Sequence, residues 1–350
     1  VIHSGLYYVP GSFRAKFTVA GRNALYRYVE ENGIQHQRCG KLVVASDASE
    51  IGPLDELERK GRANGLEGVR RLGREEIREI EPAVVGVSGL LIPETGIVDF
   101  EAVNRAYADD IRQHDGEVRL GTRFLSVVEA SDAATVLTSG GELRARQTVN
   151  CAGLQADRIA HACGVATDIR IVPFRGEYYH LADERSDLVS RPIYPVPDPA
   201  FPFLGVHLTT KFDGRIEAGP NAVLALKREG YSKTAFRFAD AVSSLGFPGF
   251  WRLAARNWRT GIGEVYRSFS KAAFARSLQK LTPEVRTEDL STGGCGVRAQ
   301  AMNADGSLVD DFRILPHGHT LHVLNTPSPA ATASLAIGDY VAEKVVERLD

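Results

Sequence analysis

Two kinds of hydrophobic periodicity alternate along the chain, and this alternation restricts the fold more than any other feature. Apolar residues recur at helical spacing over 11–32, where Asn32-Gly33 supplies a helix end that tolerates positive φ. Asp99 is a candidate N-cap for a later helix. The same reasoning predicts further short elements: a strand over 41–45, helices over 55–63, 74–81 and 100–114, and a strand over 89–93.

The second part of the chain is dominated by strand patterns. We expect a meander of short strands over 117–120, 124–129, 134–138, 142–145 and 147–151, and mostly antiparallel strands over 170–219. Residues 221–285 are helical and basic, a strand returns near 320–325, and 330–349 reads as an amphipathic helix. βα units beside a separate antiparallel sheet predict a mixed α/β (α+β) fold with two interleaved lobes, one for a cofactor and one for a substrate.

Composition narrows the class of protein. The 350 residues carry a net charge of −2, so the chain lacks the overall positive field that nucleic acids select. The four cysteines are scattered and no histidine cluster has ligand spacing, so neither a metal site nor a disulfide framework is expected, which fits a reducing compartment. No apolar run is long enough for a transmembrane helix, and no leader pattern is present. A small-molecule function is the better expectation.

Three segments combine small residues with features suited to a ligand. In 148–153, a β-branched strand ends at Ala152-Gly153, where the backbone can approach a nucleotide; the alternative is an ordinary strand-to-helix turn. In 293–300, glycines precede Arg298, a guanidinium suited to a carboxylate; the alternative is a surface arginine. In 325–334, a Pro-set helix start with small side chains could face an anion, or could serve tight helix packing.

Two of the nine histidines are candidates for a general base. His3 lies in a Gly/Ser-flanked segment before a helix, and His207 lies in a predicted strand of the second lobe. The chain has no G-x-S-x-G, Walker A, H-E-x-x-H or G-x-G-x-x-G motif. Asp310-Asp311 reads as a solvated turn rather than a metal pair, because adjacent residues on a strand point to opposite faces.

Taken together, these segments resemble the D-amino-acid-oxidase-like FAD-dependent oxidoreductase superfamily and, within it, the L-2-hydroxyglutarate dehydrogenase/oxidase group. The resemblance covers essentially the whole chain, and the motifs at 173, 219 and 328 are the most specific to the group. It rests on Val1-Ile2-His3-Ser4-Gly5-Leu6-Tyr7-Tyr8, Arg38-Cys39-Gly40-Lys41, Pro173-Phe174-Arg175-Gly176-Glu177-Tyr178-Tyr179, Tyr194-Pro195-Val196-Pro197-Asp198-Pro199, Gly219-Pro220-Asn221-Ala222 and Ser328-Pro329-Ala330-Ala331-Thr332-Ala333-Ser334-Leu335.

The resemblance implies an FAD-binding domain of Rossmann type and an antiparallel substrate domain. The first would comprise 1–38, 99–170 and 289–350, and the second 39–98 and 171–288, with a basic and aromatic helical insertion at 221–285. Members of the superfamily begin with a strand, a Gly-rich loop and a helix that bind the FAD pyrophosphate. This sequence enters after that unit, so about forty to fifty residues of the family pattern are expected to precede it.

The resemblance also implies the chemistry: a hydride leaves C2 of an L-2-hydroxy acid for flavin N5 while a base takes the hydroxyl proton. Arg298 would bind the C1 carboxylate, and His3 or His207 would be the base. The distal carboxylate or the cavity wall would involve Lys41, Arg175, Tyr178 and Tyr194. The FAD contacts would come from Ser4, Gly5, Val127, Ala152, Gly153, Gly296, Ser328, Ala330, Ala331 and Thr332. The substrate would be a 2-hydroxy dicarboxylate, and the electron acceptor oxygen or a membrane quinone.

Residues 247–277 interleave aromatic with basic side chains, a composition suited to an interfacial helix on anionic lipid. The alternative is an exposed helix that covers the substrate lobe. The expected location is cytoplasmic, and the interfacial interpretation would add a peripheral contact at the inner membrane through 247–277.

Three other functions remain open at this point. An amine-oxidising relative of sarcosine, glycine or D-amino-acid oxidases would keep the chemistry and change the substrate. A glycerol-3-phosphate dehydrogenase-like enzyme would need a more cationic phosphate pocket. A fragment that cannot hold FAD would have no catalytic role.

Overall fold

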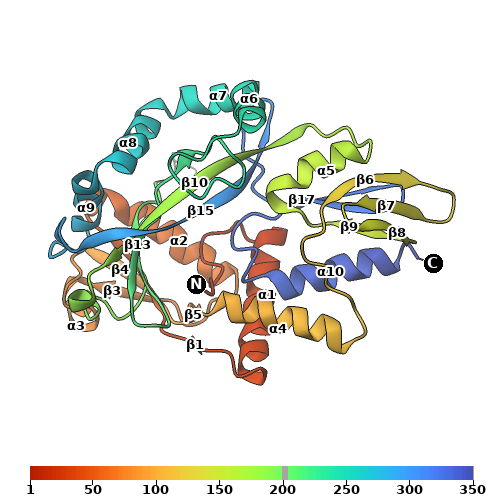
Figure 1. Ribbon diagram of the computed structural model, residues 1–350. Helices are drawn as coiled ribbons and strands as arrows, with labels where there is room; N and C mark the ends of the chain where they lie inside the picture. Colours follow the sequence, from red (N-terminus) through yellow and green to blue (C-terminus); the bar gives the residue numbers. More distant parts are fainter. Residues whose placement is uncertain (199–203, 350) are drawn as a thin grey trace.

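The computed structural model describes residues 1–198 and 204–349. Its fold is mixed α/β, as the alternating periodicity predicts (Figure 1). The helices and strands gather into two regions in this view, one around a large sheet and one that contains the C-terminus. The N-terminus lies between them.

The largest sheet is mostly antiparallel. Within the described residues it has nine strands, and eight follow one another in the order β14-β10-β13-β12-β11-β2-β4-β3, while β15 pairs with β10. Only the β11–β2 pair among its described pairings is parallel. The strands are β14 (Val223–Leu224), β10 (Ile169–Leu181), β13 (Ile216–Gly219), β12 (His207–Thr210), β11 (Ile193–Pro195), β2 (Lys41–Ala45), β4 (Ser88–Ile92), β3 (Arg70–Gly73) and β15 (Leu290–Asn303).

Strand β2 lies in the middle of this sheet and is buried along its whole length. Leu42 and Val44 pack into a core that includes Phe274 and Leu278 of α9 (Lys271–Gln279). Val43 and Ala45 pack on the other face, against α2 (Ile51–Ala63). Because successive side chains of a strand alternate between faces, Lys41 shares the face of Val43 and Ala45. Burial on both faces explains why β2 reads as a continuous apolar run after Lys41.

The second region contains two smaller sheets and most of the long helices. One sheet has the order β16-β17-β9, with β17 parallel to β9, and the other is a β6-β7-β8 meander. Helix α5 packs against β17 and α1 packs against α10. The elements are β16 (Arg313–His317), β17 (Thr320–Asn325), β9 (Thr148–Asn150), β6 (Phe124–Glu129), β7 (Ala134–Thr138), β8 (Gly141–Ala145), α1 (Phe13–Glu31), α4 (Phe100–Gln113), α5 (Ala156–Ala162) and α10 (Ser334–Val346).

Helix α1 is fixed at its N-terminus by contacts near and far in sequence. The Ser12 hydroxyl accepts a hydrogen bond from the Ala15 amide, and the Asp311 carboxylate accepts from the amides of Phe13 and Arg14. These acceptors satisfy amides that have no partner inside the helix, and the negative charge suits the helix dipole. Asp311 therefore holds the N-terminus of α1 in place. The prediction of a solvated turn at Asp310-Asp311 did not include this contact.

The basic, aromatic insertion, expected to be helical over 221–285, has no helix over 221–237, which contains strand β14. From residue 238 it forms a run of short helices along the edge of the molecule (Figure 1). These are α6 (Phe238–Leu245), α7 (Pro248–Arg256) and α8 (Trp258–Phe269), followed by α9. The remaining elements are α3 (Arg74–Ile80), the β1–β5 pair (His36–Gln37 and Ile97–Val98) and the 3-10 helices η1 (Ala48–Glu50), η2 (Gly153–Gln155) and η3 (Asp183–Arg185).

Most local predictions are confirmed. The strand at 41–45 and the Asp99 N-cap occur as expected, with the Asp99 carboxylate accepting from the amides of Glu101 and Ala102. The strand expected at 117–120 is absent from this described segment, which is irregular and carries a surface ion pair between Arg119 and Glu117. The domain boundaries stay a prediction. Pro199, the last residue of the motif that starts at Tyr194, lies outside the described residues.

Candidate active site

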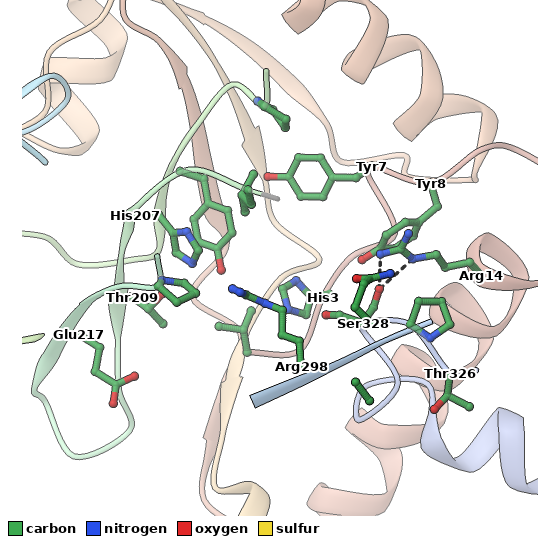
Figure 2. Close-up of a pocket in the computed structure, with 18 of the residues that line it drawn as sticks. His3, Tyr7, Tyr8, Arg14, His207, Thr209, Glu217, Arg298, Thr326 and Ser328 are labelled. Carbon is green, nitrogen blue, oxygen red and sulfur yellow. Dashed lines mark hydrogen bonds between the residues drawn. The ribbon is translucent and has the colours of Figure 1, made fainter. Parts of the chain in front are cut away.

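A cavity of about 730 Å³ lies where the N-terminal segment meets the large sheet. Its walls come from 1–8, the strands β10 to β13 and β15, and the segment 325–328 that precedes α10 (Figure 2). The cavity thus joins parts of the chain more than 300 residues apart. A space of this size can hold a small dicarboxylic acid together with part of a larger cofactor.

The three residues predicted to be catalytic, His3, His207 and Arg298, all line this cavity. His3 comes from the N-terminal segment, His207 from the start of β12, and Arg298 from β15. The structure therefore brings together side chains that the sequence could only nominate one by one.

His207 is held as a neutral imidazole. Its Nδ1 lies 2.8 Å from the Gly205 carbonyl oxygen, and because a carbonyl only accepts, Nδ1 carries the proton and Nε2 is left as an acceptor. The ring packs against that of Tyr194 in a tilted arrangement, with 3.8 Å between centroids and 32° between the ring planes. Burial lowers the pKa of His207 to about 3, and the positive charges of Lys41 and Arg298 act in the same direction.

His3 is likewise neutral. Burial, reinforced by the charge of Lys41, holds the pKa of His3 well below its usual range. Its amide donates to the Thr332 hydroxyl at 3.1 Å, which ties the N-terminal segment to the residues before α10. Its Nδ1 is buried and has no hydrogen-bond partner among the described residues.

Arg298 is half-buried, and its guanidinium donates to the Asn221 carbonyl oxygen at 3.2 Å. Burial lowers the pKa of Arg298 from its usual value, although a guanidinium stays charged at neutral pH. Tyr178 on β10 and Tyr194 on β11 also line the cavity, and burial raises the pKa of both phenols. Both tyrosines therefore remain protonated and can donate hydrogen bonds.

Lys41 is completely buried directly behind the cavity wall. Its Nζ donates to the Tyr7 hydroxyl at 3.2 Å and lies over the rings of Tyr7 and Tyr194, 4.3 and 4.8 Å from their centroids. Burial lowers the pKa of Lys41 to about 7. The ammonium is therefore close to its titration midpoint at neutral pH.

Arg175, like Lys41, does not line the cavity, and its contacts direct it away from the site. It is buried in an ion pair with Glu177 at 2.8 Å and donates to the Ser232 carbonyl oxygen at 2.9 Å. Glu177 also accepts from Asn221 and Ser268. Arg175 thus belongs to a satisfied internal network on the other face of β10.

The residues predicted to contact the cofactor divide into two groups. Ser328 lines the cavity, Thr332 bonds to His3, and Ser4 and Gly5 follow His3 directly, so these four lie around one junction. Ala330 and Ala331 lie in the turn between Ser328 and Thr332. Ala152, Gly153 and Gly296 do not line the cavity but lie at the end of β9 or on β15, and Val127 on β6 packs into the core next to α5.

Several cavity residues were missed by the sequence reasoning. Tyr7, Tyr8 and Arg14 come from the N-terminal segment and the start of α1, and Thr209 and Glu217 come from β12 and β13. The Arg14 guanidinium donates to the Ser328 carbonyl oxygen and lies 4.5 Å from the centroid of the Tyr8 ring. Tyr7 and Tyr8 belong to the motif that starts at Val1, which was the available signal.

Two further absences bear on the site. Among the residues that the structure describes, no group of three or more His, Cys, Asp or Glu side chains is placed to hold a metal ion. None of the helices described here is long and apolar enough to cross a membrane.

Comparison with known proteins shows the family. The sequence model of the DAO family, described as FAD dependent oxidoreductase, matches residues 1–344. The chain is 46% identical to the L-2-hydroxyglutarate dehydrogenase of Indibacter alkaliphilus, an alignment that covers 99% of this chain and 88% of the relative. It is 42% identical to the mitochondrial L-2-hydroxyglutarate dehydrogenase of Homo sapiens, covering 100% of this chain and 79% of the relative.

Solved structures share the fold at lower identity. An L-alpha-glycerophosphate oxidase from Mycoplasma pneumoniae with FAD bound superposes with a TM-score of 0.78 at 20% identity, covering 99% of this chain and 82% of that one. A glycine oxidase from Geobacillus kaustophilus superposes with a TM-score of 0.71 at 17% identity, covering 100% of this chain and 83% of that one. The chain belongs to the FAD-dependent oxidoreductase (DAO) family, and within that family it groups with the L-2-hydroxyglutarate dehydrogenases.

Proposed function

We propose that this protein uses FAD to oxidise L-2-hydroxyglutarate, or a closely similar L-2-hydroxy acid, to the 2-oxo acid. The observation that carries the proposal is the charge pattern of the cavity. A guanidinium, Arg298, lines it and an ammonium, Lys41, lies directly behind its wall, while two neutral imidazoles face the same space. This arrangement suits a dianion whose hydroxyl group must lose a proton.

The junction between the N-terminal segment and the turn before α10 fits the flavin end of FAD. The buried Ser4 hydroxyl has no partner among the described residues, and the residues from Ser328 to Ala333 carry only small side chains. Ser4, Gly5, Ser328, Ala330, Ala331 and Thr332 would hold this part of the cofactor. Val127, Ala152, Gly153 and Gly296 are assigned to its other parts. When bound, FAD supplies the acceptor for the hydride that leaves C2 of the substrate.

The side chains of the protein bind the substrate and move the proton. Arg298 forms a charge-assisted pair with the C1 carboxylate and so fixes the position of the adjacent C2 hydroxyl. One of the two imidazoles takes the hydroxyl proton: Nε2 of His207 is the free acceptor of that ring, and Nδ1 of His3 is buried without a described partner. Tyr178 and Tyr194 form the wall beside them.

The same charges argue against an amine substrate. At neutral pH an amino acid or sarcosine carries an ammonium group, which would be repelled by the positive charge of Lys41 and Arg298. A hydroxy acid carries no such group. Two carboxylates, Glu217 and Asp310, also line the cavity, but Glu217 is paired with Lys211 at 3.3 Å. The balance of charge therefore favours oxidation of a CH–OH bond over oxidation of a CH–NH bond.

The electron acceptor is the less defined partner, and one surface favours a membrane quinone over oxygen. Within 247–277 the only carboxylate is Glu264, which is buried. Exposed basic side chains there include Arg252, Arg256 and Arg259. Exposed apolar and aromatic side chains on α7 and α8 accompany them: Trp251, Trp258, Ile262, Val265, Tyr266 and Phe269. This combination suits a peripheral contact with anionic lipid, such as the inner membrane of a cell.

The reaction is tested by flavin content and dye reduction. The full chain, purified with FAD, should be yellow and should reduce dichloroindophenol with L-2-hydroxyglutarate and not with the D isomer. A yellow protein that ignores both isomers but oxidises glycine or sarcosine would replace the proposal with an amine oxidase. Absence of flavin absorbance both in this chain and in a version extended by the N-terminal strand, Gly-rich loop and helix of the family pattern would contradict the oxidoreductase assignment.

The membrane contact is tested with vesicles. Binding to vesicles that contain phosphatidylglycerol should exceed binding to pure phosphatidylcholine, and Trp251→Ser with Trp258→Ser should weaken it. Tyr231→Ser is the matched control, because Tyr231 is an equally exposed aromatic residue outside α7 and α8. Equal binding to both vesicle types would show that the surface is an ordinary exposed face.

A further inference from the structure

Lys41 is a buried cation without an anionic partner in the part of the chain that the structure describes. Its side chain is completely buried, and it forms no ion pair with any carboxylate among the described residues. An isolated charge in a protein interior is costly, so lysines are rarely fully buried unless they are paired. The partner of Lys41 is expected to arrive with the substrate.

The described groups that face Lys41 come from three parts of the chain, and none of them is acidic. Tyr7 of the N-terminal segment and Tyr194 of β11 place their rings against the ammonium. His3 and His207 of β12 are close enough for the charge of Lys41 to lower their pKa values. The carboxylates that line the cavity, Glu217 and Asp310, are not among these groups, and Glu217 is paired with Lys211. The positive charge of Lys41 is therefore not neutralised by the described residues around it.

Tyr7 connects the buried ammonium to the cavity. The Tyr7 oxygen accepts a hydrogen bond from Lys41 Nζ, so the phenol proton is free to point elsewhere. Tyr7 lines the cavity, and in Figure 2 its ring lies across the space from Arg298, above His3. Burial keeps the pKa of Tyr7 well above its usual range, so the phenol remains a donor. An adjacent cation strengthens the donor by polarising its O–H bond.

We infer that Tyr7 and Lys41 form the recognition unit for the second carboxylate of the substrate: the Tyr7 hydroxyl donates to that carboxylate, and Lys41 orients the hydroxyl and supplies the compensating charge. Arg298 holds the first carboxylate, so the two ends of a five-carbon diacid contact two separate positive groups. This inference rests on the proposed function and narrows it, because it selects 2-hydroxy dicarboxylates over monocarboxylic 2-hydroxy acids.

The test measures binding, so that it does not depend on turnover. The dissociation constants of 2-oxoglutarate and 2-oxobutyrate are measured by titration calorimetry on the FAD-loaded protein, and their ratio reports recognition of the second carboxylate. The wild-type ratio should favour 2-oxoglutarate by at least about tenfold, and Tyr7→Phe and Lys41→Met should each reduce it by about tenfold, the size expected for a hydrogen bond to a charged group.

Two matched variants control for the substitutions themselves. Tyr28→Phe removes a tyrosine hydroxyl that donates to Asp110 on α4, and Lys271→Met removes an ammonium that donates to the Leu290 carbonyl oxygen; both residues lie outside the cavity lining. The ratio should be that of the wild type in both. If Tyr7→Phe and Lys41→Met weaken both ligands equally, the pair is structural and the inference is overturned.

The pH dependence of the binding ratio shows whether the charge of Lys41, rather than the packing of its side chain, causes the preference for 2-oxoglutarate. Since Lys41 loses its proton as the pH rises through about 7, the preference for 2-oxoglutarate should fall between pH 6 and pH 9 in the wild type. In Lys41→Met this preference should not change with pH. In Lys41→Arg, whose side chain stays charged, the preference should still be present at pH 9. A preference that is unchanged from pH 6 to pH 9 in the wild type would contradict the inference. Failure of dye reduction with an intact binding ratio would instead remove only the proposed oxidation.

Discussion

Arg175 and Arg298 lie on the paired strands β10 and β15, one position out of register, and their guanidinium groups face opposite sides of the sheet. Phe174 pairs with Arg298 and Arg175 pairs with Val297, so the alternation of strand side chains separates the two arginines. One faces the cavity, and the other is paired with Glu177. The two should therefore respond differently to the same substitution.

Replacing Arg298 with Met should lower kcat/KM for L-2-hydroxyglutarate by about 10²–10³-fold, because the loss of a charge-assisted carboxylate pair costs about 3–4 kcal/mol. The unfolding midpoint should change little. Steady-state kinetics and thermal denaturation check both parts. A variant with normal kcat/KM would exclude Arg298 as the carboxylate ligand.

Replacing Arg175 with Met should instead lower the free energy of unfolding by about 3–5 kcal/mol, because Glu177 would be left buried without its main partner. Chemical denaturation measures this change. The folded fraction should keep its affinity for 2-oxoglutarate, since Arg175 does not line the cavity. A selective loss of that affinity in a stable variant would restore Arg175 as a substrate residue.

Replacing His3 or His207 with Asn should identify the base, because removal of a general base lowers kcat by about 10²–10⁴-fold and removal of a neighbouring residue does not. Burial lowers the pKa of His207 to about 3 and holds the pKa of His3 well below its usual range, so the wild-type kcat should show no acid limb from His207 between pH 5 and pH 8 and none from His3 near neutral pH. His319→Asn is the control, since His319 is exposed and bonds to the Arg146 carbonyl oxygen. Equal, small effects at positions 3 and 207 would rule out both as the base.

Lys41→Met should stabilise the fold while it weakens substrate binding. The folded state lowers the pKa of Lys41 from 10.5 to about 7, so below pH 7 the wild type bears the full cost of a buried charge. Between pH 7 and pH 10.5 the unfolded chain binds more protons than the folded one, so the stability of the wild type rises with pH. The gain of the variant should be about 1–4 kcal/mol near pH 6 and should fade towards pH 10. Denaturation at both pH values checks this, and a gain that grows with pH would contradict it.

Gly21→Ala should disturb the contact between α1 and α10. A Cβ at this position would lie 2.6 Å from Ala333 Cα and 3.0 Å from the Thr332 carbonyl oxygen, which are backbone atoms of the turn that binds the His3 amide. The expected cost is about 1–3 kcal/mol of stability, together with weaker FAD retention. Gly52→Ala in α2 is the matched control, because nothing lies within 4 Å of its added Cβ. Equal stability and flavin content in the two variants would show that the α1–α10 contact can adjust.

The sequence by itself determined the local elements and nominated most of the site. Helix α1 ends at Asn32-Gly33 and α4 begins after Asp99. Capping and turn residues act on positions close to them in the chain, so the sequence alone is enough to predict them. His3, His207 and Arg298 were nominated by residue type and flanking residues. The motifs that resemble known flavoproteins then indicated a family that the comparisons confirm.

Only the tertiary structure decided which of these side chains meet. Arg175 and Arg298 both lie within two residues of a glycine, and the register of β10 against β15 places one in an ion pair and the other in the cavity wall. Lys41 precedes an apolar strand like many surface lysines, and only the packing of Tyr7 and Tyr194 against it shows a buried charge. The physical reason is that burial, pKa and hydrogen-bond partners depend on contacts between distant segments, which no local pattern contains.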